Sequence, residues 1–273
     1  MPYFRHSGLR FYYETAGDVT NPPLLIISGL GDYTAKCAWQ MPALAADFHV
    51  ITFDNRGAGR SSTPEGRYPL REMADDAAAV LDAAGVASAH VFGFSMGGMI
   101  ALNLTLHYPW RVRRLVLGCT TAGGRLFVHP SGDILEALTN PRTSGDRRRD
   151  FYDGLWISLG DRCRAEDFEV VEQLADAAVA NPQTLHGYVG QLEAIASHNV
   201  AGRLGEICVP SLVLHGTADR LVPPENGRLL AHHIPGAQLI LYPDAGHMFF
   251  VEMAAAVNHD IREFLLAPER GPA

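Results

Sequence analysis

Ten residues constrain the fold more than any others in this chain. His90–Met99 read HVFGFSMGGM, an apolar strand that ends in Gly-x-Ser-x-Gly and passes directly into a helix. A strand that becomes a helix around one residue forces a strained backbone at Ser95, and Gly93 and Gly97 leave room for the crowded neighbours. The serine hydroxyl then projects above the sheet. A Gly-rich turn with a capping serine would share the pattern, but the flanking strand and helix favour the first interpretation.

Short β-branched runs alternate with Ala/Leu-rich stretches of helical period over most of the chain. This alternation predicts an α/β fold, with a mostly parallel eight-stranded sheet flanked by helices. Several candidates are apolar throughout, as a strand covered on both faces should be. The first two flank Ser7-Gly8 and look like an opening hairpin. The strand candidates are Tyr3–Arg5, Leu9–Glu14, Leu24–Ser28, Val50–Phe53, His90–Phe94, Leu115–Gly118, Ser211–His215 and Gln238–Tyr242.

Helices are predicted between these strands. They cover Leu70–Ala84, which ends at the natural C′ residue Gly85, then Met96–His107, and finally about Phe250 to Leu266.

Between residues 123 and 204 the strand-like runs vanish and amphipathic stretches appear, notably Phe168–Ala180 and Pro182–Ala196. We therefore expect a core of residues 1–122 and 205–273, with a helical cap of residues 123–204 inserted between two strands. Within the cap, Asn140–Asp150 is rich in turn formers and predicts an exposed loop. Its run Arg147–Arg149 fits a solvated helix start better than a site for an anionic substrate.

Composition narrows the classes of partner. The chain is 47% hydrophobic with a net charge of −8, which allows a sizeable core and gives no basic face for nucleic acid. The polar N-terminus lacks the pattern of a secretory signal, and no segment has about 18 unbroken apolar residues, so we expect a cytoplasmic protein without a membrane partner. The cysteines are too far apart to suggest zinc or a disulfide framework, and free, mostly buried thiols are expected at Cys37, Cys119, Cys163 and Cys208.

A serine nucleophile needs a base, and the base needs an orienting acid. His247 follows the strand candidate Gln238–Tyr242, and Asp219 follows Ser211–His215. Loops at the carboxyl ends of parallel strands emerge at one edge of the sheet, so Ser95, Asp219 and His247 are expected to converge there.

Other residues could in principle serve as the acid or the base. Asp244 competes with Asp219 as the acid, but it lies three residues before His247, where a turn-forming role is the commoner use of aspartate. His215 fits a hydrogen-bonding residue beside its strand, and His232-His233 lie in a helix.

An acyl-transfer site also needs donors for the developing oxyanion. The N–H of Met96, at the start of the helix after Ser95, is one candidate. The second is the N–H of Leu30, in the loop Ser28–Asp32, whose glycines let the backbone bend towards the serine. A turn that merely connects strand to helix would fit those loop residues as well.

These motifs together resemble the α/β-hydrolase superfamily: GLG at 29–31, DNRGAGRS at 54–61, GFSMGG at 93–98, HGTAD at 215–219 and AGH at 245–247. Among its members, the chain looks most like the capped esterase and lactonase group that includes 3-oxoadipate enol-lactonases and related carbon–carbon bond hydrolases. The resemblance implies a cap over the triad, no cofactor and no metal, triad roles for Ser95, Asp219 and His247, and oxyanion-hole roles for Leu30 and Met96. Ser28 departs from the His-Gly that many relatives carry, and this leaves open how the loop is braced.

The implied reaction is attack by Ser95 on the carbonyl of a small ester or lactone, with a rate that rises as His247 loses its proton near pH 6–7. Two alternatives remain: carbon–carbon cleavage of a ring-fission diketone, and a receptor that binds a small molecule without turnover. Pocket candidates are Trp39, Trp156, Met248 and Phe249, which would form an apolar, partly aromatic acyl site, although core packing explains them equally well.

Overall fold

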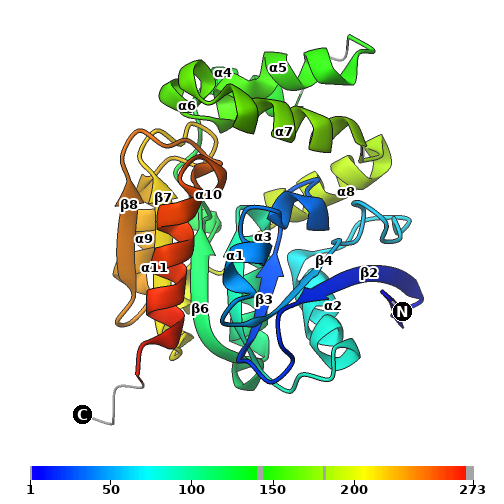
Figure 1. The fold of residues 1–273 in the computed structure, drawn as a ribbon, viewed down its shortest axis with the longest axis vertical. Coiled ribbons are helices and arrows are strands. Elements are labelled where there is room, and N and C mark those ends of the chain that lie inside the picture. The colour runs from blue at the N-terminus through cyan, green and yellow to red at the C-terminus, as the bar shows by residue number, and fades with distance from the viewer. Residues whose placement is uncertain (1, 140–143, 181–182, 269–273) are drawn as a thin grey trace.

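The sheet contains all eight expected strands. The computed structural model describes residues 2–139, 144–180 and 183–268 (Figure 1). Within them the strands form one sheet in the order β1-β2-β4-β3-β5-β6-β7-β8. They are β1 (Tyr3–His6), β2 (Leu9–Ala16), β3 (Pro23–Ile27), β4 (His49–Phe53), β5 (Ala89–Phe94), β6 (Val112–Gly118), β7 (Ser211–Gly216) and β8 (Gln238–Tyr242).

Most of the sheet is parallel. The antiparallel pairs are β1 with β2 and β2 with β4, and every pairing from β4 across to β8 is parallel. The carboxyl ends of β3, β5, β7 and β8 therefore lie along the same edge of the sheet. The predicted α/β class and the opening hairpin are confirmed.

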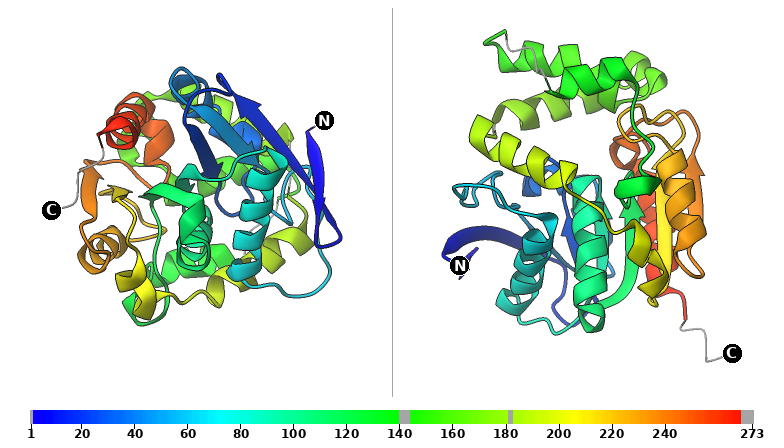
Figure 2. Two further views of the ribbon diagram at one scale, coloured as in Figure 1. Left: turned by 90° about the horizontal axis from the view of Figure 1, so that it is seen from below. Right: turned by 180° about the vertical axis from the view of Figure 1, so that it is seen from behind.

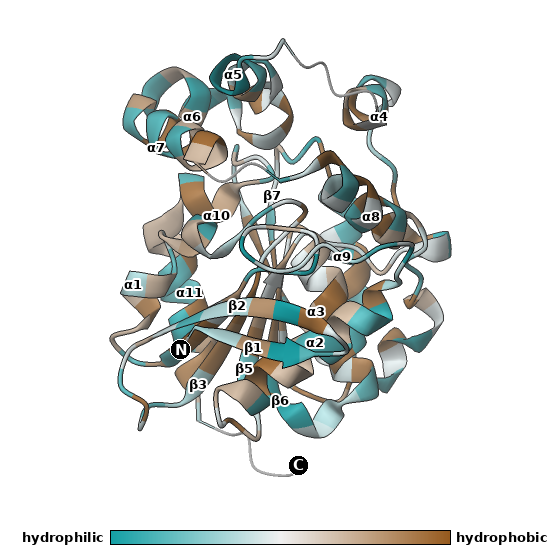
Figure 3. Ribbon diagram, turned by 90° about the vertical axis from the view of Figure 1, so that its right-hand side faces the viewer, coloured by the Kyte–Doolittle hydropathy of each residue, from teal (hydrophilic) through white to brown (hydrophobic). Residues whose placement is uncertain are grey.

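Both faces of the sheet are covered. Along β3, Leu25 and Ile27 join the cluster under α2 and α3, whereas Leu24 and Ile26 join the cluster under α1 and α11. Figure 2 shows these two helical layers on opposite sides of the sheet. In Figure 3 the parallel strands are largely apolar, and the surrounding helices mix polar and apolar residues. This explains why the strands read as continuous apolar runs.

The core helices agree with expectation except at the C-terminal end. One helix was predicted from about Phe250, but it is interrupted at Met253, whose backbone (φ −125°, ψ 36°) leaves the helical region. The core helices and 3-10 turns are η1 (Thr34–Cys37), α1 (Met41–Leu44), α2 (Leu70–Ala83), α3 (Met96–His107), η2 (Pro109–Arg111), η4 (Ala201–Glu206), α9 (Glu225–His233), α10 (Phe249–Glu252) and α11 (Ala254–Leu266). No helix among the described residues is long and apolar enough to cross a bilayer.

The segment between β6 and β7 is helical where it is described, and Figure 1 shows α4–α8 above the carboxyl edge of the sheet. Its elements are η3 (Gly124–Leu126), α4 (Gly132–Thr139), α5 (Arg147–Ser158), α6 (Asp161–Glu166), α7 (Phe168–Ala180) and α8 (Leu185–Ala196).

Two helix starts in this segment bear on the predictions made from the sequence. Helix α8 begins after Thr184, whose side chain accepts the Gly187 N–H as an N-cap; the expected start at Pro182 lies outside the described residues. In the expected loop 140–150, residues 140–143 also lie outside them. Asp146 caps α5 by accepting the N–H groups of Arg148 and Arg149, so the arginine run is a helix start, as expected. The loop prediction was therefore wrong for residues 147–150, which form the first turn of α5.

Candidate active site

Ser95 lies in a strained turn between β5 and α3. Its φ of 56° and ψ of −125° place a non-glycine residue in a region that L-residues avoid. A Cβ at Gly93 would lie 2.3 Å from the Gly97 carbonyl oxygen, and one at Gly97 would lie 2.0 Å from the Ile27 oxygen. Only glycine fits at both positions, because in each case backbone atoms occupy the space. The turn expected from the sequence is therefore present.

Backbone hydrogen bonds hold this turn. The Ser95 N–H donates to the Gly118 oxygen at 2.8 Å, and the Thr120 hydroxyl donates to the Ser95 oxygen at 2.7 Å. Residues at the end of β6 and just after it thus hold both the N–H and the carbonyl of Ser95. A strained conformation of this kind persists because the surrounding structure determines it.

Asp219 and His247 meet although 28 positions separate them. His247 Nδ1 lies 2.8 Å from Asp219 Oδ2, and both side chains are buried. Asp219 Oδ1 accepts two backbone N–H groups, from Leu221 at 2.9 Å and Val222 at 2.8 Å. His215 Nε2 lies 3.2 Å from Asp219 Oδ2 and 2.8 Å from the Val222 oxygen, so this nitrogen carries the proton. The carboxylate is held by four donors.

This arrangement sets two opposite pKa shifts. Burial alone would raise the pKa of Asp219, but the neighbouring His247 and His215 outweigh it and lower that pKa to about 2. Burial would likewise lower the pKa of His247, yet Asp219 raises it well above 6.5. The Cys119 thiol also interacts with this imidazole, but burial raises the pKa of Cys119, so the thiol is neutral at pH 7. Asp219 is the charge that acts on His247.

Ser95 and His247 line one cavity of about 290 Å³. Among the described residues no hydrogen bond joins the Ser95 hydroxyl to His247. Such bonds are often long in ligand-free sites and shorten when substrate binds. The cavity itself lies at the carboxyl edge of the sheet, below α5.

The two expected oxyanion donors flank Ser95. Met96 is the first residue of α3, where an N–H has no partner within the helix. In the other loop, the Gly31 N–H donates to Gln191 at 2.9 Å, whereas the Leu30 N–H makes no hydrogen bond within the described chain. Leu30 itself lines the cavity. Both N–H groups are available to a ligand.

The loop that carries Leu30 is braced without the histidine of many relatives. The Asn55 side chain donates to the Ser28 oxygen at 3.0 Å. Asp54 accepts the N–H of Thr34 at 2.8 Å and that of Arg60 at 2.7 Å. The turn 54–61 therefore supports the loop that carries Leu30.

Of the four pocket candidates, Met248 lines the cavity and the other three side chains are not among its lining residues. Phe249 is fully buried and stacks on Tyr242, while its neighbour Phe250 lines the cavity, because successive helical residues point about 100° apart. Trp39 packs against the core cluster under α11, and Trp156 is not among the lining residues. The lining residues are Gly29, Leu30, Asp32, Lys36, Phe94, Ser95, Asp150, Phe151, Gly154, Leu155, Ser158, Leu221, His247, Met248 and Phe250.

Sequence reasoning also missed polar residues at the site. Lys36, the chain's only lysine, lines the cavity with its ion-pair partner Asp32 at 3.6 Å. Glu252 accepts the N–H groups of Gly246 at 2.9 Å and Gly160 at 3.2 Å, and so joins the His247 loop to the helical segment. A unique lysine and a glutamate within the apolar run MFFVEM are the signals that were available.

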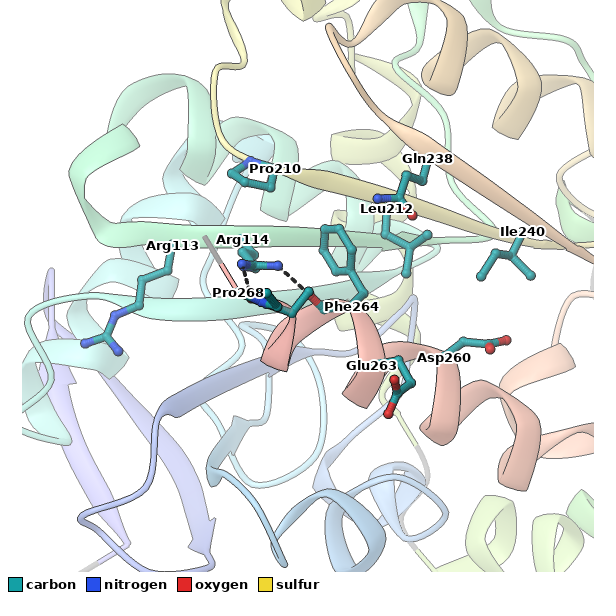
Figure 4. Close-up of a pocket in the computed structure, with 11 residues that line it drawn as sticks. Arg113, Arg114, Pro210, Leu212, Gln238, Ile240, Asp260, Glu263, Phe264 and Pro268 are labelled. Carbon is teal, nitrogen blue, oxygen red and sulfur yellow. Dashed lines mark hydrogen bonds between the residues drawn. The ribbon is translucent and has the colours of Figure 1, made fainter. Parts of the chain in front are cut away.

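A second cavity, of about 510 Å³, lies at the opposite edge of the sheet, where β6, β7 and β8 begin (Figure 4). Its one deeply buried cation, Arg114, donates to the Phe264 oxygen at 2.6 Å and the Ala267 oxygen at 2.5 Å. These bonds satisfy carbonyls at the end of α11. The arginine has a structural role there.

No group of three or more His, Cys, Asp or Glu side chains in the described part of the chain is arranged to hold a metal ion. The cysteines are free, and three of the four are buried.

Comparison with known proteins agrees with this fold. The family described as alpha/beta hydrolase fold matches residues 22–154 and 171–254. A putative carbamate hydrolase RutD of Azorhizobium caulinodans is 33% identical over 97% of both chains. A poly(3-hydroxyalkanoate) depolymerase of Ectopseudomonas oleovorans is 34% identical, covering 89% of this chain and 84% of that protein. The crystal structure of an enol-lactonase from Burkholderia xenovorans LB400 superposes with a TM-score of 0.86 and 27% identity, over 97% of this chain and 100% of that one. The chain belongs to the α/β-hydrolase family.

Proposed function

We propose that this hydrolase cleaves a small carboxylic ester or lactone through an acyl-enzyme on Ser95. One observation carries the proposal: Ser95 and His247 line a single, mostly apolar cavity beside the unused Leu30 N–H, and His247 is hydrogen-bonded to the buried Asp219. Relatives named as a depolymerase and an enol-lactonase support the same class of reaction.

In the proposed reaction, Ser95 Oγ attacks the carbonyl carbon while His247 Nε2 takes the hydroxyl proton. The N–H groups of Leu30 and Met96 stabilise the oxyanion. His247 returns the proton to the leaving oxygen as the carbon–oxygen bond breaks. A water molecule, deprotonated by His247, then attacks the acyl carbon and releases the acid and the serine. Asp219 stays ionised throughout and keeps the proton on His247 Nδ1.

We further propose that residues 123–204 act as a cap whose helix α5 forms one wall of the substrate cavity. Support comes from Phe151 and Leu155 of α5, which line the cavity opposite Phe94 of the core. A volume of about 290 Å³ is near the lower end for small-molecule sites, so acyl groups of a few carbons are expected to fit best.

The test is a substrate panel of p-nitrophenyl esters of increasing acyl length, unsubstituted lactones and ring-fission diketones, with wild type and Ser95→Ala compared. We expect turnover of short esters or lactones, and a loss in kcat of at least about 10⁴-fold in the variant. Turnover of diketones alone would favour carbon–carbon cleavage. Stoichiometric labelling of Ser95 without turnover would favour a receptor, and equal hydrolysis by Ser95→Ala would refute the serine mechanism.

A further inference from the structure

Helix α8 approaches the core unusually closely. A Cβ at Gly187 would lie 2.1 Å from the Gly57 carbonyl oxygen, and one at Gly190 would lie 3.0 Å from the Tyr68 hydroxyl. These glycines thus let the helix lie directly against the turn 54–61 and Tyr68. This contact brings the next residue of α8, Gln191, within reach of the catalytic loops.

Gln191 is fully buried, and its side-chain amide binds backbone groups of two loops. Its Oε1 accepts the Gly31 N–H at 2.9 Å, and its Nε2 donates to the Arg56 oxygen at 2.8 Å. Because an N–H can only donate and a carbonyl can only accept, these partners fix the orientation of the amide. Gln183 Nε2 donates to the same Oε1 at 2.8 Å and to the Gly57 oxygen at 3.0 Å.

The anchor on the core side is rigid. Arg56 makes two hydrogen bonds to the buried Asp76, at 2.6 Å and 2.9 Å, and a third to Glu72 at 2.7 Å. A bidentate arginine–carboxylate pair fixes position as well as charge. The Arg56 carbonyl is therefore a fixed point from which Gln191 reaches the loop of Leu30.

The Oε1 of Gln191 binds the turn of residues 29–32. Residues 29–32 close with a hydrogen bond from the Asp32 N–H to the Gly29 oxygen at 3.3 Å, and Gly31 has a φ of +70°. Binding of the Gly31 N–H to Gln191 fixes the peptide plane between Leu30 and Gly31. The neighbouring Leu30 N–H is left without a partner in the described structure, beside Ser95.

We infer that Gln191 is a positioning residue that aligns the Leu30 N–H with the oxyanion and makes this alignment depend on the helical segment. The effect of Gln191 on catalysis rests on the proposed function, whereas its effect on the loop does not. Gln191 touches neither substrate nor reacting atoms. It acts by holding the turn in the conformation that leaves one donor free.

The test compares Gln191→Leu, which removes all three side-chain hydrogen bonds at similar volume, with Gln191→Glu, which keeps an acceptor for the Gly31 N–H. The matched control is Tyr188→Phe on the same helix, which removes a hydrogen bond to the Leu138 oxygen and leaves the loop untouched. In Gln191→Leu we expect kcat for a p-nitrophenyl ester to fall about 10–100-fold with KM changed less than threefold. Gln191→Glu should recover only part of the loss, because its carboxylate accepts the Gly31 N–H but cannot donate to the Arg56 oxygen. Tyr188→Phe should stay within twofold of wild type.

A second readout separates this inference from the proposed function. Amide hydrogen exchange of the peptide covering residues 28–33 should be faster in Gln191→Leu and unchanged in Tyr188→Phe, whatever the substrate. Circular dichroism and urea unfolding establish that each variant is folded. Unchanged exchange, a kcat within twofold of wild type in folded Gln191→Leu, or equal losses in Tyr188→Phe would overturn the inference. Ser95→Ala with full activity would instead refute the serine mechanism and leave the exchange result to decide the role of Gln191 in the loop.

Discussion

Replacing Asp219 by asparagine tests the proposed site most directly, because the structure dictates which way the new amide must point. Two backbone N–H groups, from Leu221 and Val222, donate to Oδ1 at 2.9 Å and 2.8 Å. The amide oxygen of Asn must therefore take that position, and its NH₂ group must face His247. It then donates to His247 Nδ1, so the neutral ring carries its proton on Nε2. In that tautomer His247 cannot accept the proton of Ser95.

The expected loss is large. The same substitution in a Ser-His-Asp triad costs about 10⁴ in kcat, or about 5 kcal/mol of transition-state stabilisation. The pH dependence of kcat/KM should also change. Only neutral His247 is active, and Asp219 raises its pKa well above 6.5, so wild-type kcat/KM should rise with pH through a midpoint above 6.5. Without the carboxylate this midpoint should move to lower pH.

Steady-state kinetics of ester hydrolysis from pH 5 to 9 measure both effects. Asp244→Asn is the matched control, since Asp244 lies in the loop of His247 at a φ of 59°, which asparagine tolerates well. It should retain kcat within about twofold. If Asp219→Asn kept more than a tenth of wild-type kcat, or if Asp244→Asn showed the larger loss, the assignment of the acid would be wrong.

Two further predictions concern stability. Gly187→Ala places a Cβ 2.1 Å from the Gly57 oxygen and should lower the free energy of unfolding in urea by about 1–3 kcal/mol. Gly202→Ala, with no atom within 4 Å of its Cβ, should be nearly neutral. Equal effects would contradict the close packing of α8. Burial lowers the pKa of His198 to about 4, so the folded state loses stability as pH falls from 6.5 towards that value. In His198→Gln, the free energy of unfolding should therefore fall by about 1 kcal/mol less than in wild type between pH 6 and 5. An unchanged pH dependence would refute this.

The turn at Ser95 and the loops that carry Asp219 and His247 could be predicted because their signals are local. Gly93 and Gly97 are required by backbone atoms within a few residues or in the adjoining strand, and Asp219 and His247 each follow a recognisable strand. Parallel topology then brings the strand ends together without any knowledge of side-chain packing. The choice of Asp219 over Asp244 agrees with the hydrogen bond to His247.

The pocket could not be predicted in the same way. Phe249 and Phe250 are equivalent in the sequence, yet one fills the core and the other lines the cavity. Which of the two faces the site depends on the rotation of α10 about its axis, and this is set by packing against β8 and α11. Trp39 shows the same limit, since its place against the core follows from distant neighbours.

The amino-acid sequence by itself thus determined the class of sheet, the strained turn at Ser95 and the loops that carry an acid and a base, because each depends on short-range backbone sterics and on strand order. Only the tertiary structure decided that His215 also donates to Asp219, that Phe250 rather than Phe249 lines the cavity, and that Gln191 binds Gly31 from 160 positions away. These contacts join residues far apart in the chain, and no local pattern encodes the direction in which a buried side chain finds its hydrogen-bond partner.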